Sequence, residues 1–180
     1  MKLNKTLLSA LLLSFAIAGN VYAETAAEKF NSAVQYYKQQ NYQTAFPMFK
    51  ELAEQGNADA QFYLGVMYDS GRGVNQDYHQ AVKWYQKAAE QGNSDAQYNL
   101  GDMYRQGQGV NQNYYQAIKW YQKAAEQGDA QAQNNLGFMY IKGQGVRQDK
   151  SKAKYYWGLA CDNGNQKGCD NYRKLSERGY

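Results

Sequence analysis

The sequence has 180 residues and a formal net charge of +4 at pH 7, and it contains 18 Tyr but a single Pro. Its 20 Lys and Arg are spread among 16 Asp and Glu, so no basic run predicts binding to nucleic acid or to anionic lipid. A chain of this length is sufficient for one domain with a continuous core.

Residues 1–23 have the three parts of a secretory signal peptide. Lys2 and Lys5 supply positive charge, residues 7–18 form an apolar stretch, and Val21-Tyr22-Ala23 is a small-residue cleavage site. A transmembrane anchor is the alternative, but this run is short for a bilayer and no other segment is long enough. No Cys follows it to carry a lipid. We therefore predict cleavage after Ala23, a periplasmic or secreted location, and no transmembrane segment in the mature chain.

A repeat of 36 residues fills most of the remaining chain. Residues 45–80, 81–116 and 117–152 align without a gap. The second and third segments share 23 of 36 residues, and the first and second share 20. Self-similarity at a fixed period is typical of stacked repeat architectures, in which each unit packs on the next.

Each unit is predicted to contain two helices. The first begins at an Asn or Asp that can cap a helix and ends at a glycine. These starts are Asn41, Asp77, Asn113 and Asp149, and these ends are Gly56, Gly92, Gly128 and Gly164. The second helix is capped by Asn57, Asn93, Asp129 or Asn165, and in the complete units it runs to Tyr68, Tyr104 or Tyr140 before a loop with two glycines. The pattern predicts an all-α, right-handed superhelix of antiparallel helix pairs.

Periodic apolar residues in both helices indicate a core. Leu64, Met67 and Tyr68, with their copies in later units, recur at spacings of three and four and predict a buried stripe. The pairs Trp84-Tyr85 and Trp120-Tyr121 are expected to fill the space between units. We interpret them as packing residues rather than as a ligand site, because periodic aromatic stripes usually form the core.

The pattern A-Q-x-x-L-G-x-M-Y-x-x-G-x-G-V-x-Q, followed by A-x-K-W-Y-x-K-A-A-E-x-G, resembles the Sel1-like repeat family, a relative of the tetratricopeptide repeat. The resemblance implies units at residues 57–92, 93–128 and 129–164 and a capping helix at 165–180. Residues 24–56 resemble a tetratricopeptide pair with a shorter connection. Pro47 replaces a Lys of the later units, so the second helix of that pair is expected to begin near Thr44, which places Pro47 in the first turn.

Cys161 and Cys169 are the only two cysteines. In an exported protein such a pair predicts a disulfide, here between the end of one helix and the first turn of the next. The short closed loop corresponds to roughly 2–3 kcal/mol in the chain-entropy model. The same spacing resembles the secreted cysteine-rich branch of the family. Metal binding is the alternative, but no His lies nearby and no second Cys pair exists. We predict no metal and no cofactor.

Enzyme activity is the second class considered, because some cysteine-rich relatives are described as penicillin-binding proteins or weak β-lactamases. Ser151 and Lys154 match S-x-x-K, but the partner motifs S-D-N and K-T-G do not occur. A solvated first turn of a helix explains this match better. His79, the single histidine, occupies a variable first-turn position and predicts no catalytic triad. We therefore predict no catalytic residues.

The resemblance to tetratricopeptide proteins implies that the second helix of each pair lines a concave face. Variable positions on these helices are the candidate sites for a protein or peptide partner, since a core position must repeat whereas a recognition position need not. Aromatic and amide side chains would suit an extended peptide, although ordinary solvated positions are the alternative. The candidates are Phe62, Tyr63, Val66, Tyr98, Asn99, Asp102, Arg105, Asn134, Asn135, Phe138 and Ile141.

Overall fold

The structure is a computed structural model that describes residues 25–179, and every regular element in this range is a helix. The helices are α2 (Ala26–Lys38), α3 (Tyr42–Glu54), α4 (Ala58–Ser70), α5 (Tyr78–Glu90), α6 (Ser94–Gln106), α7 (Tyr114–Glu126), α8 (Ala130–Lys142), α9 (Lys150–Asp162) and α10 (Gln166–Ser176). The predicted all-α repeat fold is confirmed. The predicted signal peptide, residues 1–23, lies outside the described residues.

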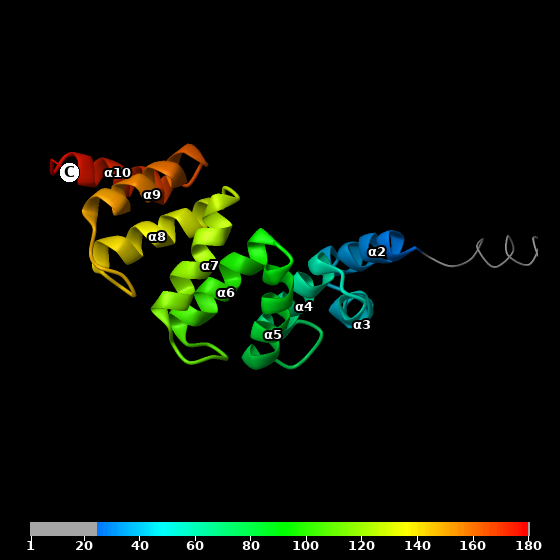
Figure 1. The fold of residues 1–180 in the computed structure, drawn as a ribbon. Coiled ribbons are helices and arrows are strands. Elements are labelled where there is room, and N and C mark those ends of the chain that lie inside the picture. Colours follow the sequence, from blue (N-terminus) through cyan, green and yellow to red (C-terminus); the bar gives the residue numbers. More distant parts are fainter. Residues whose placement is uncertain (1–24, 180) are drawn as a thin grey trace, which may run out of the picture.

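The helices stack in chain order from α2 to α10 (Figure 1). Each helix packs against the helix before it and the helix after it, and α10 packs on α9 and also touches α8. Contacts are therefore made between neighbours in sequence, as in other solenoids. One consequence is that a local change in one pair is felt mainly by the adjacent pairs.

The predicted caps close most of the helices. The side chains of Asp77, Asn113 and Asp149 each accept a hydrogen bond from a backbone N–H in the first turn that follows. Asn57, Asn93, Asp129 and Asn165 do the same for the second helix of each pair. The glycines that follow the first helices have positive φ, between 86° at Gly164 and 95° at Gly56 and Gly92. Glycine adopts this region without a steric penalty.

Asn41 occupies the predicted N-cap position of α3, but the predicted side-chain cap is absent. Its side chain makes no hydrogen bond to the backbone of the first turn and instead accepts one from the hydroxyl of Thr44 at 2.9 Å. The connection before it is tighter than in the other pairs, with Gln40 at φ 61°. Asn41 therefore enters the helix at φ −80° and ψ 68°, whereas Asp77 has φ −149° and ψ 99°.

The start predicted for the helix that contains Pro47 is wrong. The helix α3 begins at Tyr42, not near Thr44, and Pro47 lies inside it. The backbone N–H of Ala45 already donates to the Asn41 carbonyl at 3.1 Å, so the first turn is wound before Pro47 is reached. Pro47 has no N–H for the next turn, and its cost of about 3 kcal/mol must be offset by the tertiary packing of α3.

The second helix of each repeat extends two residues beyond the predicted tyrosine. The helices α4, α6 and α8 end at Ser70, Gln106 and Lys142. Each is closed by a left-handed glycine, namely Gly71, Gly107 or Gly143. The predicted buried stripe is confirmed at Leu64 and Met67, whereas Tyr68 is only half-buried.

Glycines in the middle of α4, α6 and α8 bring consecutive helices close together. A Cβ added at Gly65 would lie 2.6 Å from the Tyr85 ring, and one added at Gly101 would lie 2.7 Å from the Tyr121 ring. Gly137 has the same relation to Trp157. The predicted core role of the aromatic pairs is confirmed, since Tyr85 and Tyr121 are almost completely buried and Trp84 and Trp120 are more than nine-tenths buried.

A row of buried glutamines joins each second helix to the helix before it, namely α4 to α3, α6 to α5 and α8 to α7. The side chains of Gln61, Gln97 and Gln133 each donate to the backbone carbonyl of the alanine eight residues earlier, at 3.0–3.1 Å. Each glutamine also accepts a hydrogen bond from an amide one repeat further on, from Gln91, Gln127 and Asn163 respectively. Both the side-chain nitrogen and the side-chain oxygen of each glutamine therefore have a partner, although these residues are 4% exposed or less.

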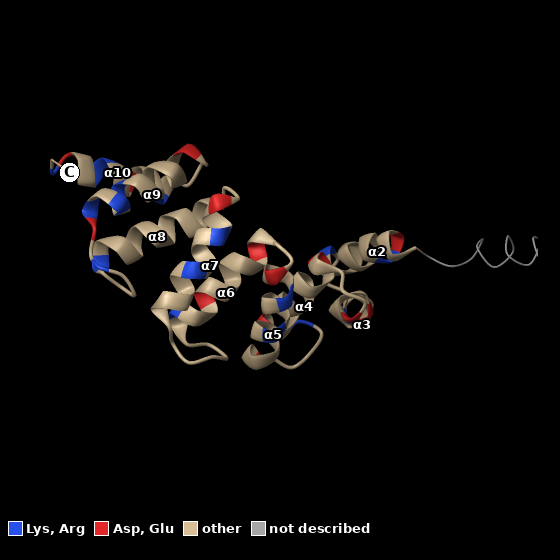
Figure 2. Ribbon diagram, viewed as in Figure 1, with Lys and Arg blue, Asp and Glu red and all other residues tan. Residues whose placement is uncertain are grey.

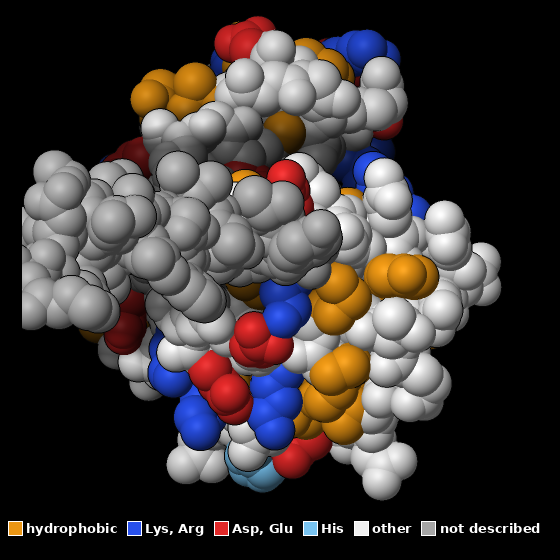
Figure 3. All heavy atoms as spheres, turned by 90° about the vertical axis from the view of Figure 1, so that its right-hand side faces the viewer, with side chains coloured by type: hydrophobic (Ala, Val, Ile, Leu, Met, Phe, Trp, Pro, Cys, Tyr) orange, Lys and Arg blue, Asp and Glu red, His pale blue; other side chains and the backbone are white. Residues whose placement is uncertain are grey.

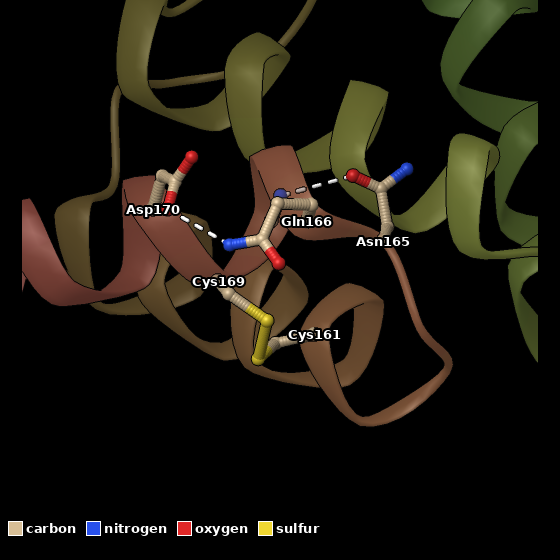
Figure 4. The surroundings of a disulfide bond; sticks show 6 residues. Cys161, Asn165, Gln166, Cys169 and Asp170 are labelled. Atoms are coloured by element: carbon tan, nitrogen blue, oxygen red, sulfur yellow. Dashed lines mark hydrogen bonds between the residues drawn. A yellow bond between two sulfur atoms is a disulfide. The ribbon is translucent and has the colours of Figure 1, made fainter.

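The predicted disulfide between Cys161 and Cys169 is present and joins α9 to α10, with the two Cα atoms 4.5 Å apart (Figure 4). Cys161 stands 36 residues after Ala125 and Cys169 stands 36 residues after Gln133. The covalent bond therefore occupies the place at which the earlier pairs have the hydrogen bond from glutamine to the alanine carbonyl.

Candidate functional site

The candidate residues lie on three successive second helices. Phe62, Tyr63 and Val66 are on α4, four others are on α6, and the last four are on α8. All are half-buried except Asn134, which is only 7% exposed. We call the surface formed by these variable side chains the variable face.

Equivalent positions 62, 98 and 134 of the variable face lie against aromatic side chains of the next helix. The Phe62 ring lies 6.1 Å from the Tyr85 ring, and the Tyr98 ring lies 5.9 Å from the Tyr121 ring, measured between centroids. In α8 the equivalent residue is Asn134, whose backbone carbonyl accepts a hydrogen bond from the Trp157 indole at 3.2 Å. Phe62 and Tyr98 thus each face a tyrosine ring of the next helix, whereas Asn134 faces Trp157.

Tyr63 differs from its counterparts because it belongs to the N-terminal core. Its ring stacks on Phe49 with a centroid distance of 4.7 Å and an interplanar angle of 3°. The equivalent residues are Asn99, which hydrogen-bonds Tyr85, and Asn135, which hydrogen-bonds Tyr98. Burial raises the pKa of the Tyr98 phenol, and the bond from Asn135 lowers it in part. Each asparagine therefore lies beside a tyrosine hydroxyl, that of Tyr85 on α5 and that of Tyr98 on α6.

A charged network lies at the middle of the variable face, on α6. Arg105 donates to Asp102 at 2.9 Å and to the Tyr121 hydroxyl at 3.2 Å. The Tyr121 hydroxyl itself donates to Asp102. Burial and the nearby Asp102 carboxylate raise the pKa of Tyr121, so this phenol stays protonated as a donor. The network presents one anion and one cation in a fixed arrangement.

The positions equivalent to Asp102 and Arg105 of this network hold other residues in α4 and α8. The Tyr85 hydroxyl donates to Asp69 at 3.3 Å, and burial raises the pKa of that carboxyl despite this bond. In α8 the ring is Trp157, and Phe138 packs against it edge to face at 5.4 Å. Ile141 packs in the same apolar cluster. The variable face is therefore polar in its centre and apolar towards α8.

A pocket of about 490 Å³ opens where the variable face reaches α10. Its lining joins three helices of successive units: Tyr98 from α6, Gln131, Asn134 and Asn135 from α8, and Gly164, Asn165, Gln166 and Lys167 from the start of α10. Three of the sequence-predicted residues meet here. Gln131 and the residues of α10 were missed, although the repeat alignment shows that positions 59, 95, 131 and 167 read Asp, Asp, Gln and Lys.

Charge is distributed unevenly along the chain. Figure 2 shows Lys and Arg gathered on α9 and α10, whereas acids lie at the start of α4 and α6. Burial, together with Asp129 and Asp59, raises the pKa of Asp95. Towards the N-terminal end of the molecule, hydrophobic side chains lie in small groups between charged ones (Figure 3). The acids Asp59 and Asp95 thus lie at the starts of α4 and α6, whereas the basic residues gather on α9 and α10.

The residues considered for catalysis lie apart from the variable face. Ser151 is in the first turn of α9 and exposed, and Lys154 lies 5.4 Å from the centre of the Tyr172 ring. His79 is exposed in the first turn of α5. Among the described residues, no group of three or more His, Cys, Asp or Glu is placed to hold a metal ion. None of the helices from α2 to α10 combines the length and apolar character needed to cross a membrane.

A family model described as "Sel1 repeat" matches residues 30–57, 58–93, 94–129 and 130–165. Among solved structures, a Sel1 repeat protein from Oxalobacter formigenes is 33% identical with a TM-score of 0.79, over 84% of this chain and 60% of that one. The protective antigen c5321, which is present in uropathogenic Escherichia coli strains and displays an SLR fold, is 34% identical with a TM-score of 0.83, over 99% of this chain and 37% of that one. The chain therefore spans less than two thirds of either protein.

Cysteine rich protein B from Helicobacter pylori is 22% identical with a TM-score of 0.55, and it covers 81% of this chain and 96% of its own. At this identity the likeness concerns the fold alone. Among curated proteins, none matches the sequence.

Proposed function

Since this chain belongs to the Sel1 repeat family, we propose that it is an exported scaffold that binds an extended peptide segment of a protein partner along its variable face. Sel1 repeat folds are in general protein-interaction scaffolds. The observation that carries the proposal is the variable face itself. It combines flat aromatic surface at Phe62 and Tyr98 with amides at Asn99 and Asn135, beside positions such as Leu64 and Met67 that repeat without change.

The side chains of this face match the needs of an extended main chain. An asparagine amide can both donate to a peptide carbonyl and accept from a peptide N–H. Aromatic rings offer contact area at low cost in conformational entropy. The hydrogen bonds of Asn99 to Tyr85 and Asn135 to Tyr98 fix these groups before a ligand arrives, which reduces the entropy lost on binding. The proposed role requires no chemistry on the partner.

Export is part of the proposal and is supported by two features. Residues 1–23 have the composition of a secretory signal, and the Cys161–Cys169 disulfide is of a kind that persists in oxidising compartments. Mass spectrometry of the protein recovered from the periplasm and the culture medium of expressing cells is expected to find a mature chain that starts at Glu24. Recovery of only the full-length chain in the cytoplasm would contradict export.

Selection from a random peptide library on the purified mature protein tests the binding role. A selected peptide is expected to bind at least about tenfold more weakly to the Tyr98→Ala/Asn99→Ala variant, because both the stacking surface and an amide are removed. Tyr115→Ala is the matched control, since Tyr115 is 67% exposed on α7 and lies off the variable face.

Circular dichroism and thermal unfolding must accompany the measurement, because Tyr98 also packs on Tyr121. Asn99→Ala alone keeps that ring contact and serves as the milder variant. Peptides that bind the folded double variant as tightly as the unaltered protein would remove the variable face from the proposal.

A further inference from the structure

The pocket between α6, α8 and α10, which we call the α10 pocket, contains a buried polar group without a partner. Asn134 lines this pocket, is 7% exposed, and has a side-chain Oδ1 without any hydrogen-bond partner in the described part of the chain. A buried acceptor left unpaired costs about 1–3 kcal/mol. At the equivalent positions of α4 and α6, Phe62 and Tyr98 pack on rings instead. The amide is therefore specific to α8, where the facing ring is Trp157 instead of a tyrosine.

A second feature of the α10 pocket is a reversal of charge at the start of a helix. The position occupied by Asp59 in α4 and by Asp95 in α6 is Lys167 in α10. Acidic side chains are favoured in the first turn because the N-terminal end of a helix is positive, so Lys167 opposes this preference. Residues that break a local rule in a regular repeat are candidates for function.

The backbone at the same point adds donors. Asn165 caps α10 by accepting from the N–H of Gly168 at 3.0 Å, which Figure 4 shows as a dashed line from Asn165. The N–H groups of Gln166 and Lys167 precede that bond and have no acceptor within the helix. The Gln166 side chain is turned away to Asp170, to which it donates at 3.1 Å. A cation and free N–H groups thus lie beside the pocket.

We propose that the α10 pocket binds a carboxylate of the peptide that lies on the variable face. Lys167 and the first N–H groups of α10 hold the carboxylate, and the Asn134 amide bonds the adjacent peptide group. Rotation about the last side-chain bond exchanges the oxygen and nitrogen of this amide, so that either a donor or an acceptor can be presented. The single charge of a carboxylate matches the single cation among the lining residues.

The proposal rests on the proposed function and gives the bound chain a direction. The carboxylate end lies at α10, and the remainder runs towards α6 and α4. Asp95 and Asp59 lie there, so the preceding part of the peptide is expected to be neutral or basic. Tyr98 contributes to both regions, since it lines the pocket and belongs to the variable face.

Short peptides with and without a carboxylate test this inference by NMR on the isotopically labelled mature protein. The probes are N-acetyl-Ala-Ala-Ala with a free C-terminal carboxylate, the same peptide with a C-terminal amide, and N-acetyl-Ala-Glu-Ala amide. Millimolar amounts of the first probe are expected to shift the backbone signals of Gln166 and Lys167 and the side-chain amide signals of Asn134. The amidated alanine peptide is expected to leave them in place. A response to the third probe identifies an acidic side chain as an accepted source of the carboxylate.

Charge reversal supplies the matched variants. Lys167→Glu restores the acid of α4 and α6 at this position and is therefore expected to fold normally while the shifts fall about tenfold at equal probe concentration. Lys119→Glu, an equal change of charge at an exposed position of α7, is expected to keep them. Asn134→Leu replaces the amide with an apolar side chain of similar size. This variant is expected to keep α8 intact and to reduce the shifts.

The inference is overturned if neither carboxylate probe shifts these signals, if the amidated alanine peptide acts equally, or if Lys167→Glu keeps the response. Peptides selected on the variable face decide separately on the proposed function. Loss of their binding in Tyr98→Ala/Asn99→Ala, together with equal response to the acid and the amide probes, would retain the face and reject the carboxylate pocket.

Discussion

The internal repeats and the C-terminal hairpin connect equivalent helices by different means. Inside the solenoid, the side chain of Gln97 donates to the Ala89 carbonyl at 3.1 Å across the α5–α6 junction. At the α9–α10 junction the same two positions are Cys161 and Cys169, joined by a disulfide. A hydrogen bond that serves in a fully packed repeat is thus replaced by a covalent bond where α10 packs only on α9 and α8.

The difference follows from what a buried glutamine needs. Gln97 also accepts a bond from Gln127 at 2.8 Å, one repeat further on. Position 169 is only half-buried, whereas Gln97 is 4% exposed, so the hydrogen bond of a glutamine at 169 would compete with water and contribute less than that of Gln97. A disulfide needs no outside partner. It is accompanied by Gly168 in place of the usual alanine, since a Cβ there would lie 2.6 Å from that of Ala160.

The largest expected effect concerns the glycines that bring helices together in the internal repeats, a position at which α10 has no glycine. Gly101→Ala is expected to lower the free energy of unfolding by about 3 kcal/mol, because its Cβ would lie 2.7 Å from the buried Tyr121 ring. The equivalent residue of α10 is the exposed Arg173, and Arg173→Ala is expected to change it by less than about 0.5 kcal/mol. Urea unfolding followed by circular dichroism measures both. Equal effects would show that close helix contact is not specific to the internal repeats.

The next effect concerns the disulfide. Cys161→Ala/Cys169→Ala is expected to destabilise the terminal hairpin by about 2–3 kcal/mol, since the closed loop is short. Contacts in the solenoid are made between neighbours, so hydrogen exchange should accelerate in α10 and the end of α9 and stay unchanged in α4 and α6. Faster exchange along the whole chain would contradict this local role.

A variant with the internal pattern sharpens the same test. Cys161→Ala/Cys169→Gln places the alanine and glutamine of the earlier junctions in the terminal hairpin and keeps Gly168, because a Cβ there would lie 2.6 Å from that of Ala160. It is expected to regain only part of the lost protection, because a glutamine at the half-buried position 169 makes its hydrogen bond in competition with water. Full recovery would show that the hydrogen bond serves as well as the disulfide at this junction.

Much of the fold could be predicted from the sequence because the same helix-capping and packing residues recur at equivalent positions of each repeat. Asp77, Asn113 and Asp149 occupy one position with one chemistry, and each caps a helix. The ends of the second helices were predicted two residues too early in every copy, but the errors in helix start fall where only one copy exists. Asn41 and Pro47 belong to the pair with the shorter connection, whose geometry no other unit repeats.

The candidate site was less accessible to prediction, since its contacts cross between repeats. The sequence placed Asp102 and Arg105 on α6, but their shared bonds with Tyr121 depend on how α7 packs against α6. Asp69 was overlooked although it aligns with Arg105 and Ile141, which were both candidates; its bond with Tyr85 likewise depends on how α5 packs against α4. Gln166 and Lys167 lie beyond the three complete units, and the pocket that they form with Asn134 depends on how α10 stacks against α8.

The smallest of the expected effects measures the hydrogen bond that the disulfide replaces. Gln97→Ala is expected to cost about 1–1.5 kcal/mol in urea unfolding, because the buried hydrogen bond from Gln97 to the Ala89 carbonyl is lost while that carbonyl keeps its bond from the Gly92 N–H. Gln106→Ala, a change at an exposed position of the same helix, is the control and should cost less than about 0.5 kcal/mol.

A double-mutant cycle with Gln127→Ala separates the two bonds of Gln97. The bond between Gln127 and Gln97 at 2.8 Å is only partly buried, so a coupling of about 0.5–1 kcal/mol is expected. The remainder of the loss then belongs to the bond within the α5–α6 junction, the bond whose place the disulfide takes between α9 and α10. A coupling as large as the whole cost of Gln97→Ala would instead assign the glutamine's contribution to the joint between repeats. The disulfide would then replace only the weaker of its two bonds.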